Sequence, residues 1–128
     1  MYNITKSGER GDLYAVVGSP GGAVIPQFVI KTLIGMLDWG LNPQQAVSLP
    51  NFGARNNPET GIGGEHPDIG QNGTATPEAQ ELIDGLTRRG HSVNLDEQSS
   101  GLSAIIRTRD GHLLGGADPR REGAVLGG

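Results

Sequence analysis

The sequence lacks cysteine, is poor in aromatic residues and has no long hydrophobic run. Without cysteine the chain forms neither disulfides nor thiolate metal sites, although periplasmic and cytosolic proteins can both lack this residue. Aromatic residues make up only 4% of the chain, which predicts a thin core that depends on a partner to complete its packing. No stretch approaches the roughly 20 apolar residues needed to span a bilayer, so we expect no membrane partner.

A broad positive surface is missing as well. The formal net charge is −4 at pH 7, which argues against binding to a phosphate backbone, so we expect no nucleic-acid partner. His66, His91 and His112 are scattered and lack the close spacing of zinc ligands. We therefore expect neither a metal nor a cofactor. The length of 128 residues fits one domain or a piece of one.

Glycine, in contrast, is abundant, with 22 residues among 128 and no collagen-like period. This composition predicts tight turns and close approaches of the backbone. The densest cluster, Gly18-Ser19-Pro20-Gly21-Gly22, follows an apolar run at 13–17, which predicts a strand. It precedes a segment at 24–38 with apolar residues at helical spacing. That segment predicts a helix that is apolar on more than one side and is covered on both.

Two further helices are indicated by capping residues. Asn42 and Thr76 each stand before a proline, which is the order of an N-cap and a first helical residue. Gln45 is placed to reach back to Asn42 and complete a capping box. The helix that starts after Thr76 is expected to end at Gly90, since glycine is the usual residue just beyond a helix C-terminus.

The remaining segments predict a connection and three strands. The stretch 51–75 is rich in Gly, Asn and Pro, which predicts an irregular connection with one short strand. Alternating or apolar runs at 91–95, 102–108 and 113–117 predict strands, the last two joined as a hairpin. The order of elements indicates an α/β layered (α+β) fold, a single domain over 1–128 with a mainly antiparallel sheet.

The corner at Gly21 and Gly22 is the strongest candidate for a site. Two successive glycines leave their backbone N–H groups uncovered, and a helix that begins next adds unpaired amides and the positive end of its dipole. Such donors hold an oxyanion or a carboxylate, and they stabilise the charge that develops in acyl transfer. On spacing alone, a turn that serves only tight packing remains the alternative.

A second candidate stands at 118–122, directly after the last predicted strand. Asp118, Arg120, Arg121 and Glu122 place charges of both signs within five positions. They either bind an anionic group or form an ion-paired turn. We favour the ion-paired turn, since neighbouring opposite charges at the end of a strand commonly pair with one another.

Three separated segments together resemble one family. They are VGSPGG at 17–22, LDWGLNPQQAV at 37–47 and GGADPRREG at 115–123. In this order, and from near Met1 to Gly128, the sequence is similar to the end of the small subunit of γ-glutamyltransferase. Three matches in register are much more specific than a single glycine pattern.

The resemblance implies an N-terminal-nucleophile hydrolase with an αββα sandwich, of which this chain is a partial domain. Such an enzyme is made as one precursor that cuts itself into a large and a small subunit, and the new N-terminal threonine attacks the γ-glutamyl amide. The resemblance assigns the oxyanion hole to the N–H groups of Gly21 and Gly22. It assigns substrate binding to Gly21, Gly22 and Ser19, with Ser19 and Pro20 shaping the loop.

The resemblance also implies partners and a location. The partners are a small γ-glutamyl substrate such as glutathione, the remainder of the small subunit, and the large subunit of the same precursor. The implied location of the parent enzyme is periplasmic or extracellular. Acyl transfer to water or to an amino acid or peptide is the implied activity.

The nucleophile expected from the resemblance is not in this chain. In the family it opens a run resembling Thr-Thr-His-Phe, and no threonine of this sequence stands in one. A serine and an arginine that contact the substrate are likewise expected outside these residues. We therefore expect the isolated chain to be inactive. The alternative function is that of a non-catalytic remnant or of a module that binds small carboxylates.

Overall fold

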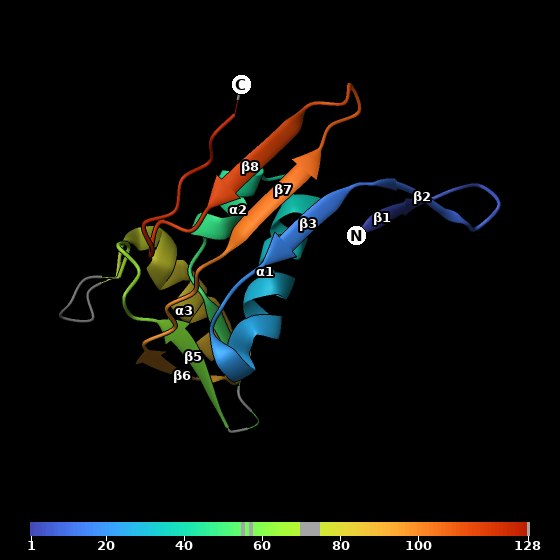
Figure 1. The fold of residues 1–128 in the computed structure, drawn as a ribbon. Helices are drawn as coiled ribbons and strands as arrows, with labels where there is room; N and C mark the ends of the chain where they lie inside the picture. The colour runs from blue at the N-terminus through green and yellow to red at the C-terminus, as the bar shows by residue number, and fades with distance from the viewer. Residues whose placement is uncertain (55, 57, 70–74, 128) are drawn as a thin grey trace.

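A three-stranded antiparallel sheet carries the glycine-rich corner at one end. In the computed structural model, which describes residues 1–54, 56, 58–69 and 75–127, its order is β3 (Ala15–Gly18), β7 (Ser103–Arg107) and β8 (Leu113–Ala117) (Figure 1). The turn between β7 and β8 uses Gly111, whose φ of 89° lies in the left-handed region that glycine adopts freely. The predicted hairpin is confirmed, and the strand predicted at 13–17 starts two positions later, at residue 15.

One face of this sheet is covered by two helices, α1 (Ile25–Leu37) and α2 (Pro43–Ser48). A 3-10 turn, η1 (Gly22–Val24), leads into α1, and Pro26 occupies the first helical turn, where its missing N–H is not needed. The helix predicted at 24–38 is therefore confirmed. The helices and the sheet enclose a core made of Phe28, Met36, Ala46, Val47, Leu102 and Ala104.

The capping residues of α2 and of α3 (Pro77–Arg88) bond as the sequence predicts. The Asn42 side chain accepts a hydrogen bond from the Gln45 N–H (2.8 Å), and the Gln45 side chain accepts one from the Asn42 N–H (3.0 Å). These two bonds form the capping box. Thr76 accepts a hydrogen bond from the Ala79 N–H (3.4 Å) at the start of α3. Local sequence thus fixes where both helices begin.

A second sheet has the order β4 (Phe52–Ala54), β5 (Glu59–Gly63) and β6 (Ser92–Asp96). The prediction of one short strand within 51–75 is wrong, because β4 and β5 both lie there; residues 55, 57 and 70–74 lie outside the described part. Short glycine-rich strands lack the apolar alternation by which a strand is recognised. The mainly antiparallel pairing has one exception: β6 pairs parallel with β5, since α3 forms the crossover between them.

α3 covers this second sheet. The buried residues between them are Ile62, Ile69 and Ala79, and the partly buried Leu82 and Val93 pack against these. The α/β layered arrangement predicted from the order of elements is therefore present in the chain, with helices packed on sheets in two places (Figure 1).

A further hairpin, β1 (Tyr2–Ile4) and β2 (Arg10–Leu13), precedes β3. Gly8 forms its turn with a φ of 84°, and the hairpin projects beyond the end of the sheet (Figure 1). The sequence predicts no strand at 2–4, because polar and apolar residues are mixed there over only three positions. Across the described ranges, every helix is too short or too polar to cross a membrane.

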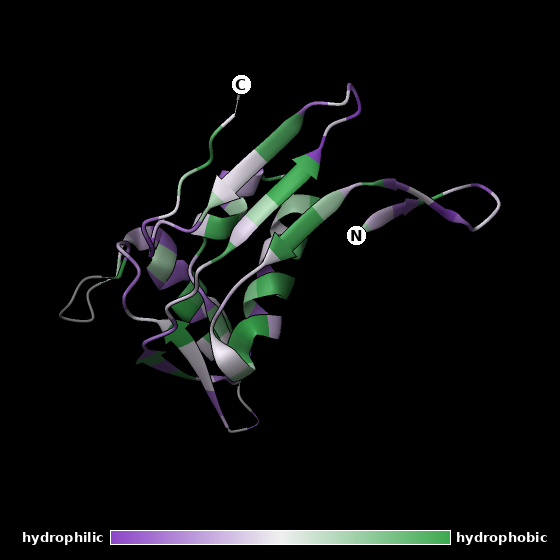
Figure 2. Cartoon of the chain, viewed as in Figure 1, coloured by the Kyte–Doolittle hydropathy of each residue, from purple (hydrophilic) through white to green (hydrophobic). Residues whose placement is uncertain are grey.

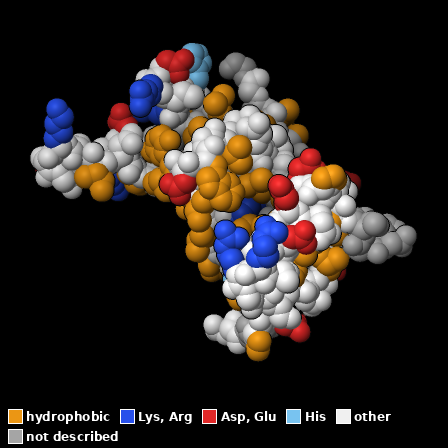
Figure 3. Space-filling model, turned by 180° about the vertical axis from the view of Figure 1, so that it is seen from behind, with side chains coloured by type: hydrophobic (Ala, Val, Ile, Leu, Met, Phe, Trp, Pro, Cys, Tyr) orange, Lys and Arg blue, Asp and Glu red, His pale blue; other side chains and the backbone are white. Residues whose placement is uncertain are grey.

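Two apolar faces remain exposed. On the sheet, Val16, Ile105 and Leu113 share the face turned away from the helices and are exposed, and Figure 2 shows hydrophobic residues along these strands. From behind, hydrophobic side chains gather across the middle of the molecule (Figure 3). The outer side of α1 exposes Ile30, Ile34 and Leu37. The helix is thus apolar on more than one side, and its cover on the second side stays a prediction.

Candidate functional site

The glycine-rich corner joins the end of β3 to η1 and α1. Gly21 is the N-cap of η1 with a φ of 139°, and Gly22, the first residue of η1, has a φ of 67°. Residues with a Cβ rarely adopt either conformation. A Cβ on Gly21 would also lie 3.0 Å from the Phe28 ring, whereas a Cβ on Gly22 would meet open space. The positive φ therefore favours glycine at both positions, and the Phe28 ring is a second reason at Gly21.

The N–H groups of Gly21 and Gly22 stand at the start of a helical segment, where no preceding turn supplies acceptors. In the described part of the chain, neither N–H group donates a backbone hydrogen bond of a turn, loop or cap. Both residues are exposed. The positive end of the α1 dipole adds to the same potential. The arrangement can receive a negatively charged oxygen, and its part in catalysis stays a prediction.

Ser19 ties this corner to the segment before β7. Its hydroxyl accepts a hydrogen bond from the Gly101 N–H (3.1 Å) and donates one to the Pro20 carbonyl (2.7 Å). A Cβ on Gly101 would lie 2.8 Å from both Pro20 Cγ and Arg121 Cδ, so a side chain there has no room. These contacts fix the shape of the loop. The substrate contact that the resemblance assigns to Ser19 stays a prediction.

A pocket of about 430 Å³ opens beside the corner. This volume lies in the range of pockets that hold small molecules. Its wall combines apolar, polar and charged residues, among them Gly21, Val24, Phe28, Glu97, Gln98 and Arg121. Of these, Glu97 and Arg121 place one charge of each sign on the pocket wall. No local sequence pattern predicts that residues 97–98 lie beside the corner, because the two segments are far apart in the chain.

A buried polar network connects the 98–102 segment to the turn after β8. Ser100 donates a hydrogen bond to the Asp118 carboxylate and accepts one from the Asn51 side-chain amide (2.9 Å). The Leu102 N–H also donates to Asp118 (3.0 Å). Burial raises the pKa of Asp118, but these hydrogen bonds and the Arg120 charge together hold that pKa below its ordinary value. Asp118 is thus a charged acceptor that fixes this turn in place.

Within the turn at 118–122, Asp118 and Arg120 form an ion pair, as the favoured interpretation predicts for these two residues. Arg120 Nη1 lies 3.0 Å from Asp118 Oδ1, and Arg120 Nε lies 3.3 Å from the Glu65 carboxylate. Arg120 Nη2 donates to the Leu49 carbonyl (2.9 Å). Because the guanidinium is buried among these partners, Arg120 stabilises the fold and is not accessible to a ligand.

Lys31 is buried, and the sequence predicts no role for it. Its Nζ donates to carbonyl groups at the end of α2, those of Ala46 (3.2 Å), Val47 (3.4 Å) and Leu49 (3.1 Å). Burial, together with the nearby Arg120 charge, lowers the pKa of Lys31 to about 7. The one sequence feature that could indicate its burial is a lysine within a helix that is apolar on several sides.

The histidines have protein partners of their own. His66 is buried, its Nε2 donates to the Ser48 carbonyl (2.7 Å), and its Nδ1 accepts from the Asp68 N–H (3.2 Å). These bonds correspond to the neutral tautomer protonated at Nε2. In the ranges that the structure describes, no group of three or more His, Cys, Asp or Glu residues is placed to hold a metal ion.

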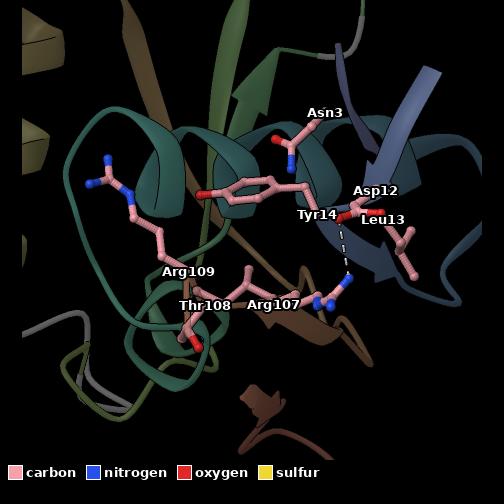
Figure 4. A pocket seen from close by; sticks show the side chains of 8 residues that line it. Asn3, Asp12, Leu13, Tyr14, Arg107, Thr108 and Arg109 are labelled. Carbon is pink, nitrogen blue, oxygen red and sulfur yellow. Dashed lines mark ion pairs between the residues drawn. The ribbon is translucent and has the colours of Figure 1, made fainter. Parts of the chain in front are cut away.

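A second pocket, of about 500 Å³, lies at the opposite end of β3 and β7 (Figure 4). It is lined in part by Tyr14, Arg107 and Arg109, and Arg107 points toward Asp12, with 3.7 Å between the charged atoms. None of the predicted site residues is among its described lining residues. The smaller pocket at the glycine-rich corner is therefore the better candidate for the functional site.

The chain is similar to known proteins over nearly its whole length. The family model for gamma-glutamyltranspeptidase matches residues 4–128. The chain is 33% identical over 128 residues to the glutathione hydrolase-like YwrD proenzyme of Bacillus subtilis (strain 168), a match that covers 97% of this chain and 22% of that protein. It is 28% identical over 110 residues to the glutathione hydrolase proenzyme of Escherichia coli (strain K12), with coverages of 86% and 17%.

The fold is shared as well. The crystal structure of a mutant Helicobacter pylori gamma-glutamyltranspeptidase is similar to this chain with a TM-score of 0.67 and 25% identity, over 94% of this chain and 60% of that one. The chain spans about a fifth of the length of the curated relatives that it matches. The chain therefore belongs to the γ-glutamyltranspeptidase family, within the N-terminal-nucleophile hydrolase superfamily.

Proposed function

We propose that the complete protein containing this chain hydrolyses or transfers γ-glutamyl groups from glutathione and related γ-glutamyl amides, and that this chain supplies the oxyanion hole. The observation that carries the proposal is the conformation of Gly21 and Gly22 at the start of a helical segment: both residues are exposed, neither N–H group donates to a backbone acceptor in a turn, loop or cap of the described residues, and Gly21 lines a pocket of ligand size. Two matched relatives bear the names of glutathione hydrolase and glutathione hydrolase-like proenzymes, which supports this substrate class.

In the proposed reaction, a threonine hydroxyl outside these residues attacks the γ-carbonyl carbon. The carbonyl oxygen gains a negative charge, which the N–H groups of Gly21 and Gly22 stabilise; loss of one such donor commonly costs roughly 3 kcal/mol. The carbon–nitrogen bond then breaks, the amine leaves with a proton, and a threonyl ester remains. Water or the amine of an amino acid or peptide adds to the ester, releases the γ-glutamyl product and returns the proton to the threonine oxygen.

The proposed protein partners are the remainder of the small subunit and the large subunit of the same precursor. The exposed apolar residues support this part of the proposal, because full burial of one large aliphatic side chain contributes about 1.5–3 kcal/mol. A second sheet packed on Val16 and Ile105 would complete an αββα sandwich.

The periplasmic or extracellular location implied by the resemblance belongs to the same proposal, and cell fractionation tests it.

The experiment compares the complete precursor with the 128-residue chain. Both are assayed with γ-glutamyl-p-nitroanilide, which releases coloured p-nitroaniline on acylation. We expect release with the complete protein and none with the chain alone. Release by neither would overturn the proposal, and carboxylate binding without any release would favour the alternative of a binding module.

A further inference from the structure

Two adjacent arginines of the turn after β8 have different surroundings. Arg120 is buried against Asp118, Glu65 and backbone carbonyls. Arg121 is exposed and lines the pocket beside the glycine-rich corner. Its Nε donates a hydrogen bond to the Ser100 carbonyl (3.1 Å). Among the described residues, its two terminal nitrogens make no hydrogen bond or ion pair, so both can bind a ligand.

Arg121 is also held in a defined position relative to the corner. Its Cδ and the Cγ of Pro20 both approach the position that a Cβ would take on Gly101 (2.8 Å each). The Gly101 N–H in turn donates to Ser19, two residues before Gly21. The arginine stem and the glycine-rich corner therefore pack against the same residue, which places the guanidinium beside the corner.

The pocket between them matches the chemistry of an amino acid or short peptide. A guanidinium binds a carboxylate through two parallel hydrogen bonds. Phe28 and Val24 give the pocket an apolar wall for a side chain. Glu97 places a negative charge on the same wall, which disfavours ligands with more than one carboxylate there.

We propose that this pocket holds the amine side of the reaction, and that Arg121 binds the terminal carboxylate of the amino acid or peptide that leaves or accepts the γ-glutamyl group. This rests on the proposed function, which places the reacting carbonyl at Gly21 and Gly22. Leaving and accepting amines occupy the same place, because transfer to an amine is the reverse of acylation. The α-carboxylate of the γ-glutamyl group is a different carboxylate, and this proposal does not assign it to Arg121.

The test uses the enzyme matured from the complete precursor and compares kcat/KM for glutathione with that for glutathione amidated at its C-terminus. We expect the parent to prefer glutathione by roughly tenfold or more, the usual effect of a charged hydrogen-bonded pair. Arg121→Gln should abolish this preference by lowering the value for glutathione alone. γ-Glutamyl-p-nitroanilide, whose leaving group has no carboxylate, should be cleaved within about threefold of the parent rate.

Two matched variants complete the design. Arg121→Lys keeps the charge and should retain part of the preference, whereas Arg109→Gln, in the exposed turn before β8, should leave it unchanged. A parent without preference, or an Arg121→Gln variant that slows all three substrates equally, overturns the subsite and leaves the proposed function standing. Absence of cleavage of every γ-glutamyl substrate by the parent overturns the proposed function itself.

Discussion

The hydroxyl of Ser19 accepts a hydrogen bond from the backbone N–H of Gly101, 82 positions later in the chain, at 3.1 Å. This bond joins the corner that follows β3 to the segment that enters β7. The backbone of Gly21 and Gly22 therefore depends on a residue in the C-terminal third of the chain.

Ser19→Ala should slow acylation without unfolding the protein. The change removes the acceptor of the Gly101 N–H and the donor to Pro20, so the loop before Gly21 loses two bonds. We expect the acylation rate to fall about tenfold and the free energy of unfolding by about 1 kcal/mol, the net value of a typical hydrogen bond. Stopped-flow release of p-nitroaniline measures the rate. Ser19→Thr, which keeps the hydroxyl, serves as the control, and equal rates for parent and alanine variant would contradict the expectation.

Gly101→Ala should damage the site more than the fold. The added Cβ would lie 2.8 Å from Pro20 and Arg121, so one of them must move away from the pocket. Overpacking of this kind costs about 1–3 kcal/mol, and here its relief distorts the glycine-rich corner. We expect kcat/KM for γ-glutamyl-p-nitroanilide to fall at least as far as in Ser19→Ala. Gly18→Ala, where a Cβ meets no atom within 4 Å, should be nearly neutral; a larger loss there would contradict this explanation.

Gly116→Ala should destabilise the packing of α2 on β8. A Cβ on Gly116 would lie 2.5 Å from the backbone carbon of Pro43, and a backbone atom cannot swing aside as a side chain does. We expect a loss of about 2 kcal/mol, within the usual range for overpacking. The midpoint of urea unfolding measures it. Gly64→Ala is the control, because its Cβ would make an ordinary contact of 3.5 Å; similar midpoints for both variants would show that the approach of α2 is not tight.

Lys31 should make stability depend on pH above neutrality. Its pKa is about 7 in the folded chain, against an ordinary value of 10.5, so between these values the unfolded chain binds more protons. The contribution of this lysine to stability should therefore rise with pH from about 7 to 10.5. Urea unfolding across this range should show a shallower rise for Lys31→Met than for the parent. Lys6→Met, at an exposed lysine, is the control, and parallel curves for the parent and Lys31→Met would contradict the prediction.

The helices and the corner could be predicted from sequence because their determinants are local. A cap followed by proline at Asn42 and Thr76 fixes a helix start within four residues, and successive glycines mark a sharp turn wherever they occur. The hairpin of β7 and β8 is equally local. The resemblance then gave the corner a chemical role that spacing alone left open.

Three of the missed features depend on contacts between distant segments. The parallel pairing of β5 with β6 requires the crossover through α3, and glycine-rich β5 shows no alternation of its own. Lys31 and Arg120 are far apart in the sequence, yet both donate a hydrogen bond to the Leu49 carbonyl at the end of α2. Residues 97–98 lie in the same pocket wall as Gly21 only once the chain has folded. No pattern within one segment predicts contacts between distant segments.

The most direct measurement of the central claim is the acylation rate of the complete enzyme with Gly21→Ala and, separately, Gly22→Ala. If the N–H groups of this corner stabilise the oxyanion, the first change should lower the rate roughly 100-fold, because it disturbs both the φ of 139° and the contact with Phe28. The second should lower it less, since a Cβ there meets open space. Rates within threefold of the parent for both variants, with unchanged unfolding midpoints, would contradict the assignment.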